Sequence, residues 1–195
     1  MQTAFRSEER YSMSAFVHWL RARPPGDIHR YELLAGHIVM TPPASGLHGA
    51  IEAQLGAALF NHVEAHRLGR IFSSSTGYEL PSGDIVEPDL SFVCSAKLAA
   101  GPPLAAGKFA RFVPDLVVEI LSPTTARRDR TEKQRIYEKN GVAEYWIVSP
   151  GSRSVSMSHL VDGAFTKPVH LVSEEIVSRA VPGLRLPVSK VFAGL

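Results

Sequence analysis

Cysteine is almost missing from this sequence of 195 residues, in which Cys94 stands alone. A single cysteine cannot form a disulfide within the chain, and it excludes a zinc site built from several cysteines of one chain. Long apolar runs are missing too, since none approaches the roughly 18 residues that cross a membrane. The charged segment MQTAFRSEERYS at the start is not followed by the apolar stretch of a secretory signal. We therefore expect a cytoplasmic protein with no membrane partner.

A strong excess of one charge is also absent. The 21 basic and 19 acidic residues leave a net charge of +2, which is too small to indicate nucleic-acid binding by itself. Hydrophobic residues make up 45% of the chain, as in ordinary globular proteins. The length suits one domain. We predict a single domain with an N-terminal helix and hairpin at about 12–43, a core at about 47–150, and a C-terminal hairpin and tail at about 151–195.

Two segments in the core have apolar residues at helical spacing. The longer covers residues 47–67. The shorter, DRTEKQRIYEKNG, begins with an Asp129-x-x-Glu132 capping pattern and ends at Asn140-Gly141. Strand-like segments accompany them, at residues 70–80, 84–94, 114–121 and 144–150. The order helix, strand, strand, strand, helix, strand predicts a mixed α/β core.

Hairpins are predicted on both sides of this core. Ala35-Gly36 separates two apolar runs, and Asp162-Gly163 is a typical hairpin turn. A short amphipathic helix at residues 12–22 precedes the first hairpin. The Gly/Pro/Ala-rich linker at 96–111 predicts a loop.

One glutamate stands inside an apolar run. In LVVEIL, Val117, Glu119 and Leu121 share one face of a strand, and both faces are apolar enough to be buried. A buried carboxylate is costly unless a cation, a metal ion or several donors meet it. A buried ion pair is one explanation for Glu119. A metal ligand or an acid/base group is the other, and we favour it because buried acids are uncommon and need a reason.

A second acidic group lies on the strand predicted at 84–94. Glu87 and Asp89 point to the same side of that strand, which by itself indicates only a solvated face. Asp89 can nevertheless approach Glu119 from a neighbouring strand, within the range that a metal ion bridges. Asp115 cannot, because four positions along one strand separate it from Glu119 by about 13 Å.

The helix that follows Glu119 carries a lysine on its apolar side. Lys133 shares a stripe with Asp129, Ile136, Tyr137 and Asn140. Its ammonium either extends to solvent or points at Glu119 and a substrate phosphate. The opposite face is basic and suits a polyanionic substrate, although a solvated helix face has the same composition. The basic residues on this face are Arg127, Arg128, Arg130 and Arg135, and the first three are the candidates for nucleic-acid binding.

Four segments of the chain resemble a known family. They are RYELLAGHIV, EPDLSFV, PDLVVEILSPTTARRDRTEKQRIYEKNGVAEYWIVSP and VPGLRLPVSKVF. They are similar to the Uma-type restriction endonuclease family of the PD-(D/E)XK nuclease superfamily, from about residue 12 to the C-terminus. The resemblance implies a restriction-endonuclease-like α/β fold, a homodimer, and a site for Mg²⁺ or Mn²⁺.

The resemblance also implies roles for individual residues. Asp89 and Glu119 would be the acidic metal ligands, and the backbone carbonyl of Ile120 would complete the protein's share of the site. The superfamily's lysine two residues after the glutamate is absent, because that position is Leu121. The resemblance points to Lys133 in its place. Weaker candidates for the same site are Glu32, His48 and Tyr137, although a histidine near a helix start is more often a cap or a surface group.

The resulting hypothesis is a metal-dependent endonuclease that hydrolyses phosphodiester bonds, with DNA as the expected substrate. RNA is not separated from DNA by any sequence feature, and target preference would come from loops such as 96–111. The alternative is a catalytically inactive nucleic-acid-binding or dimerisation module of the same fold, which Leu121 keeps open. The distance from the Lys133 nitrogen to the Asp89 and Glu119 oxygens discriminates between the two.

Overall fold

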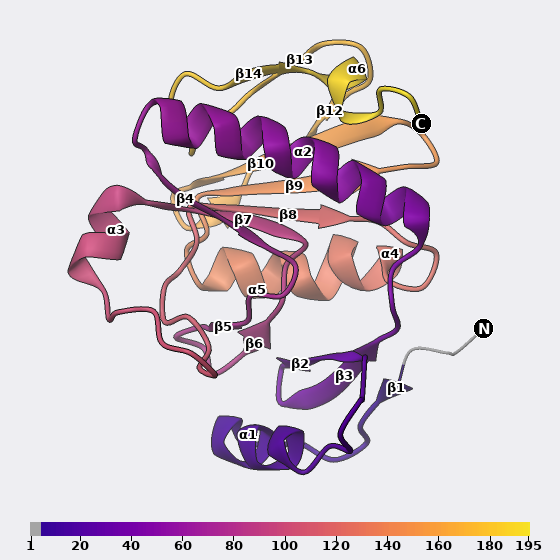
Figure 1. Ribbon diagram of the computed structural model, residues 1–195, viewed down its shortest axis with the longest axis vertical. Coiled ribbons are helices and arrows are strands. Elements are labelled where there is room, and N and C mark those ends of the chain that lie inside the picture. The colour runs from indigo at the N-terminus through magenta and orange to yellow at the C-terminus, as the bar shows by residue number, and fades with distance from the viewer. Residues whose placement is uncertain (1–4) are drawn as a thin grey trace.

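The computed structural model describes residues 5–195 and arranges them around a seven-stranded mixed sheet (Figure 1). Strands β8 and β9 are parallel, and the other neighbours in this sheet are antiparallel. The order across the sheet is β11-β10-β9-β8-β7-β4, and β12 also pairs with β10. These strands are β4 (Gly69–Ser73), β7 (Leu90–Cys94), β8 (Leu116–Ile120), β9 (Glu144–Ser149), β10 (Ser154–Val161), β11 (Ala164–Phe165) and β12 (Val169–Leu171).

Helices cover both faces of this sheet (Figure 1). On one face lies α2 (Gly46–Ala65), and its Leu55 and Leu59 pack with Phe92 and Trp146 of the sheet. Burying a side chain of this size contributes about 1.5–3 kcal/mol, so this stripe is the main reason that α2 stays on the sheet. On the other face lies a helix of three consecutive parts, namely α4 (Ala126–Arg128), a π-helical turn (Asp129–Lys133) and α5 (Gln134–Lys139).

A second, antiparallel sheet lies beside the start of α2 and carries the N-terminal helix α1 (Met13–Arg21) (Figure 1). Phe16 of α1 is fully buried against Leu33 and Ile38 of this sheet. The strands, in spatial order, are β1 (Phe5–Arg6), β3 (His37–Thr41), β2 (Arg30–Leu34), β6 (Ile85–Val86) and β5 (Tyr78–Glu79). The remaining elements are α3 (Ser95–Ala100), β13 (Glu175–Val177), β14 (Arg185–Pro187) and α6 (Val188–Val191).

The predicted mixed α/β core and its flanking hairpins are confirmed. The hairpins are β2–β3, which turns at Ala35-Gly36, and β10–β11, which turns at Asp162-Gly163. Strand β8 is buried along its whole length, as its apolar sequence indicates. No helix among residues 5–195 combines the length and the apolar character that a membrane crossing requires. The N-terminal segment in which no secretory signal was expected begins at residue 1. Its residues 1–4 lie outside the described part of the chain.

Two segments that were each predicted to form one strand form two strands instead. The segment 70–80 divides into β4 and β5, because the serine-rich turn after Ser73 interrupts it. The segment 84–94 divides into β6 and β7, which belong to different sheets. Pro88 lies at the break, where it has no N–H to offer a strand partner. As a result, Glu87 and Asp89 lie in the connection between the two sheets rather than in the middle of one strand.

Two smaller predictions also need correction. The loop expected at 96–111 contains the short helix α3 at its start. The helix expected to begin at Asp129 begins one turn earlier, where Ser122 Oγ accepts a hydrogen bond from the backbone N–H of Thr125 at 3.2 Å. Asp129 is therefore not a cap. Its side chain lies inside the helix region and is buried.

Candidate active site

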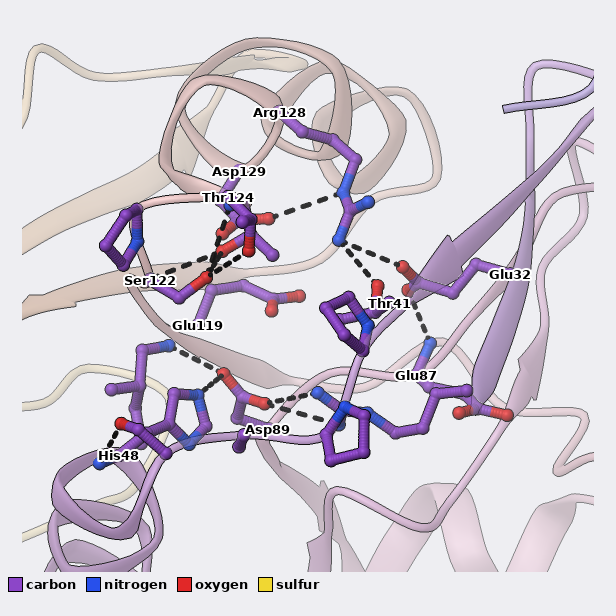
Figure 2. A pocket seen from close by; sticks show the side chains of 18 of the residues that line it. Glu32, Thr41, His48, Glu87, Asp89, Glu119, Ser122, Thr124, Arg128 and Asp129 are labelled. Carbon is purple, nitrogen blue, oxygen red and sulfur yellow. Dashed lines mark hydrogen bonds and ion pairs between the residues drawn. The ribbon is translucent and has the colours of Figure 1, made fainter. Parts of the chain in front are cut away.

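A pocket of about 430 Å³ opens where the two sheets meet (Figure 2). Its walls come from the β2–β3 hairpin, the start of α2, the end of β8 and the α4–π segment. The charged groups that line it are the acids Glu32, Glu87, Asp89, Glu119 and Asp129, the cations Arg30, Arg128 and Lys133, and His48. Five carboxyl groups outnumber the three permanent cations in the pocket, so it offers many oxygen ligands to a bound cation.

Asp89 lies immediately before β7, and hydrogen bonds fix both of its oxygens. Oδ2 accepts from the backbone N–H of Ile120 at 2.8 Å and lies 3.1 Å from Nε2 of His48. Oδ1 accepts from Arg30 at 3.3 Å. Burial acts to raise the pKa of Asp89, but the hydrogen bond from His48 and the charge of Arg30 outweigh it and lower that pKa. Asp89 is therefore an ionised carboxylate held in one orientation.

Glu119 is buried on the side of β8 that faces the π-helical turn, as the strand pattern predicted. Its Oε1 lies 2.5 Å from Nζ of Lys133 and accepts a hydrogen bond from the Tyr137 hydroxyl at 2.6 Å. Burial, with the nearby carboxylates of Asp129 and Asp89, raises the pKa of Glu119 to about 8 despite the opposing charge of Lys133. Glu119 therefore has a buried cation as its partner, as one explanation predicted, and it also lines an acidic pocket, as the other requires.

Lys133 does not extend to solvent, since its side chain is 2% exposed. Its ammonium lies between Glu119 and Glu32, with Oε1 of Glu32 at 2.9 Å. Burial acts to lower the pKa of Lys133, but Glu119, Glu32 and the more distant Asp129 outweigh burial and raise it above its ordinary value. The Lys133 nitrogen was expected to lie near the oxygens of both Asp89 and Glu119, and it does so only for Glu119. Asp89 instead has Arg30 and His48 as its partners.

Glu32 and Glu87 form the wall of the pocket on the side of the second sheet. Glu32 accepts a hydrogen bond from the backbone N–H of Glu87 at 2.8 Å. Burial acts to raise the pKa of Glu32, but Lys133 and Arg128 lower it. Burial and the charge of Glu32 raise the pKa of Glu87 to about 7. The second wall therefore contains one firmly ionised acid and one acid that titrates near neutral pH.

The three arginines predicted to bind nucleic acid from one exposed face do not share that face. Arg127 and Arg130 are exposed, whereas the side chain of Arg128 is 13% exposed and lines the acidic pocket. The placement of Arg128 on the exposed face was wrong because a π-helical turn follows it. Bonding over five residues instead of four brings positions five apart, such as Arg128 and Lys133, to the same side.

The donor atoms fit a hard divalent cation, which prefers oxygen ligands. Glu119 contributes a carboxylate from β8, and Asp89 contributes one from the position just before the adjacent strand β7. Among the described residues, His48, Glu52 and Asp89 also bring one potential ligand atom each within 4.8 Å of one another. The sequence interpretation missed Glu52, although it lies four positions after His48 on one helix face. It also missed Arg30, which lies two positions before Glu32 and so on the same face of β2.

A solved structure shares this fold. A protein from Anabaena variabilis ATCC 29413, described as "a putative nuclease belonging to DUF820", matches 93% of this chain with 97% of its own chain. The TM-score is 0.75 at 20% sequence identity, which establishes a shared fold. The chain belongs to the Uma2 family, whose model carries the description "Putative restriction endonuclease" and matches residues 15–189. The resemblance found in the sequence is therefore confirmed.

A curated relative is similar over most of its length. The "Uncharacterized protein slr1290" of Synechocystis sp. is 26% identical over 171 residues, which are 85% of this chain and 85% of the relative. Its description gives no activity. Family membership supports a nuclease at the level of the reaction class.

Proposed function

We propose that this protein is a metal-dependent endonuclease that hydrolyses phosphodiester bonds in DNA. The observation that carries the proposal is the placement of Lys133. Its ammonium lies 2.5 Å from Glu119 in the pocket that Asp89 also lines, so a lysine occupies the site although Leu121 stands at the expected position. An acidic pocket with a fixed ammonium is the arrangement expected of phosphodiester hydrolysis with a divalent cation.

Asp89, Glu119 and the backbone carbonyl of Ile120 would hold Mg²⁺ or Mn²⁺. Such an ion, when bound, supplies the positive charge that activates water and a phosphate group. His48 and Arg30 orient Asp89, and Tyr137 orients Glu119, through the contacts described above. Orientation of ligands by such partners is worth about 10–100-fold in metal affinity.

Lys133 acts as a permanent positive charge in this proposal. Because its carboxylate neighbours raise its pKa, it does not give up a proton near neutral pH and is unsuited to act as a general base. It positions the attacking water and stabilises the negative charge that develops on the phosphate oxygens. Glu32, on the opposite side of the ammonium, keeps Lys133 in place.

The direct test is a cleavage assay with purified protein, Mg²⁺ or Mn²⁺, and a panel of single- and double-stranded DNA and RNA. We expect cleavage of DNA that stops when the metal is chelated. Cleavage of RNA but not of DNA would show that RNA is the substrate and that the DNA part of the proposal is wrong. Binding of DNA without any cleavage would favour the inactive module of the same fold. The homodimer implied by the family resemblance stays a prediction, which light scattering of the purified protein tests.

A basic pocket beside the acidic one supports a polymeric substrate. It has a volume of about 530 Å³, and Arg127 and Arg130 line it together with Leu47. Both pockets are lined by the same four residues at their junction, Ser45, His48, Ser122 and Pro123. A strand whose reacting phosphate lies in the acidic pocket can thus place a flanking phosphate beside the two arginines.

We expect the double substitution of Arg127→Ala and Arg130→Ala to weaken DNA binding with little change in kcat. Each lost phosphate contact should reduce the slope of log affinity against log salt by about 0.9 on duplex DNA. Fluorescence anisotropy at several salt concentrations measures both effects. Lys190→Ala, which removes an exposed charge from α6, is the matched control. An unchanged salt slope in the double variant would remove these arginines from the interface.

A further inference from the structure

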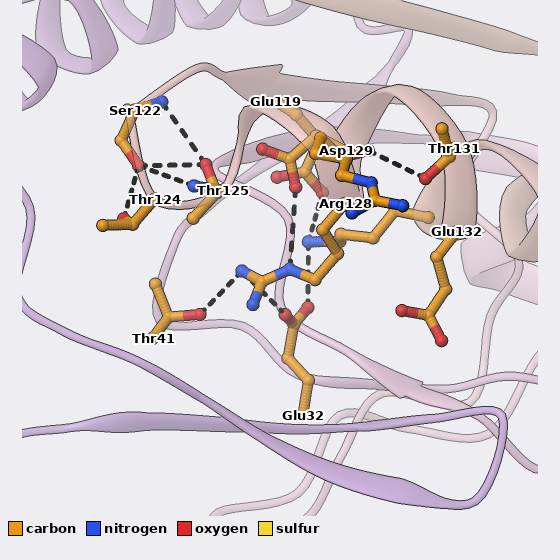
Figure 3. Close-up of polar contacts among 12 residues, drawn as sticks. Glu32, Thr41, Glu119, Ser122, Thr124, Thr125, Arg128, Asp129, Thr131 and Glu132 are labelled. Atoms are coloured by element: carbon orange, nitrogen blue, oxygen red, sulfur yellow. Dashed lines mark hydrogen bonds and ion pairs between the residues drawn. The ribbon is translucent and has the colours of Figure 1, made fainter. Parts of the chain in front are cut away.

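Arg128 points from α4 into the acidic pocket and is poorly satisfied there (Figure 3). Its Nη2 donates a hydrogen bond to Thr41 Oγ1 at 2.8 Å, which is the one hydrogen bond it makes with the described residues. Its Nε is buried and has no hydrogen-bond partner. An arginine at 13% exposure normally has most of its donors satisfied, so these free donors need a reason.

The carboxylates around Arg128 do not supply that reason. Glu32 Oε2 lies 3.9 Å from Nη2, and Asp129 Oδ1 lies 3.9 Å from Nε, both beyond hydrogen-bond distance. Glu32 already accepts from Lys133 and from the backbone N–H of Glu87. Asp129 Oδ1 is itself buried without a hydrogen-bond partner. The guanidinium is thus attracted to two acids without being bound to either.

We propose that Arg128 is a catalytic residue that binds the non-bridging oxygens of the phosphate being cleaved. This inference rests on the proposed function and assigns it a phosphate-binding group. The planar guanidinium offers paired donors that match two phosphate oxygens, which the ammonium of Lys133 cannot do. It also supplies donors for an anion in a pocket that five carboxyl groups line.

A purely structural role is the competing explanation. The bond to Thr41 joins α4 to the end of β3, so Arg128 could serve only to hold the β2–β3 hairpin against the helix. The two roles predict different results for Thr41→Val, which breaks this bond and keeps the guanidinium. If Arg128 only holds the hairpin against the helix, Thr41→Val should lose as much cleavage activity as Arg128→Ala. If Arg128 binds phosphate, Thr41→Val should retain most of the activity.

The test compares Arg128→Ala, Arg128→Lys and Thr41→Val with the wild type in cleavage kinetics and thermal unfolding. We expect Arg128→Ala to lower kcat by about 10²–10³-fold, the effect of removing one transition-state donor. Arg128→Lys should recover only a small part, and added guanidinium ion should partly rescue Arg128→Ala. Thr41→Val should lose less than about tenfold. Arg135→Ala, an exposed position on the same helix, is the matched control. Equal losses in Arg128→Ala and Thr41→Val, or no loss in Arg128→Ala, would overturn the proposal.

A binding measurement separates this inference from the proposed function. Inorganic phosphate is titrated by calorimetry into Mg²⁺-containing solutions of the wild type and of Arg128→Ala. We expect heat of binding in the wild type and its loss in the variant, with Mg²⁺ binding unchanged in both. If the wild type cleaves no nucleic acid but shows this difference, the proposed function fails and the phosphate site stands. If cleavage occurs and the two proteins bind phosphate equally, the phosphate site fails and the proposed function stands.

Discussion

Replacing Glu119 by glutamine is expected to remove divalent-metal binding and to abolish cleavage, while the protein stays folded. The amide keeps the shape of the carboxyl group but cannot provide an anionic ligand. Groups that only orient a ligand are worth about 10–100-fold in metal affinity, so loss of the ligand itself should exceed that range. Folding should survive because burial raises the pKa of Glu119 to about 8, so a neutral side chain at this position costs the folded, metal-free protein little. Calorimetric titration with Mg²⁺ and Mn²⁺ measures binding, and thermal unfolding measures stability.

The raised pKa of Glu119 also determines the direction in which stability changes with pH. A carboxyl group whose pKa is raised from 4.5 to about 8 in the folded state carries a proton there that the unfolded state has lost. Stability of the metal-free wild type should therefore fall as pH rises from about 5 to 8, and this fall should be smaller in Glu119→Gln. Metal binding displaces the proton, so the affinity of the wild type should rise over the same interval.

Two further variants identify the ligands. Asp89→Asn should abolish metal binding whether the ion is held with Glu119 or with His48 and Glu52, because Asp89 belongs to both groups. Glu52→Gln is the matched control for Glu119→Gln. If Glu52→Gln loses the metal and Glu119→Gln retains it, the ion is held at the start of α2, and our assignment of Glu119 as a ligand is wrong.

Replacing Lys133 by methionine is expected to give the opposite combination, in which metal binding persists and cleavage is lost. Loss of one preorganised charge costs about 10²–10³-fold in kcat. Removing a positive charge from an acidic pocket should leave metal affinity unchanged or increase it. Single-turnover cleavage and calorimetry, with Lys139→Met as an exposed control on α5, provide the measurements.

The Lys133→Met variant should also fold. Breaking a buried ion pair costs about 3–5 kcal/mol when a charge is left alone. Here Glu119 can take up a proton, because burial already favours its neutral form, and Glu32 keeps Arg128 and the N–H of Glu87 nearby. The loss of stability should therefore be smaller than that range. Wild-type cleavage by this variant would exclude Lys133 from the mechanism, and loss of metal binding would show that Lys133 builds the site instead.

Local patterns were sufficient for several parts of the fold. Alternation in LVVEIL placed Glu119 on an interior strand, and helical spacing put Lys133 and Tyr137 on one inward stripe. Turn residues located both hairpins. These predictions succeeded because strand and helix periods set which neighbouring positions share a face. The division of segment 84–94 between two sheets was missed, because pairing partners distant in sequence decide it.

The sequence by itself determined the fold class and predicted several of the charged residues that line the pocket, since apolar periodicity and a lone buried acid are properties of short segments. Only the tertiary structure decided how these residues meet. It paired Lys133 with Glu119 and Glu32, gave Asp89 to Arg30 and His48, and turned Arg128 inward. The physical reason is that side chains from strands, helices and a connecting segment far apart in the sequence converge in one pocket. Their distances depend on sheet pairing and on one π-helical turn, which the spacing of residues along the chain does not specify.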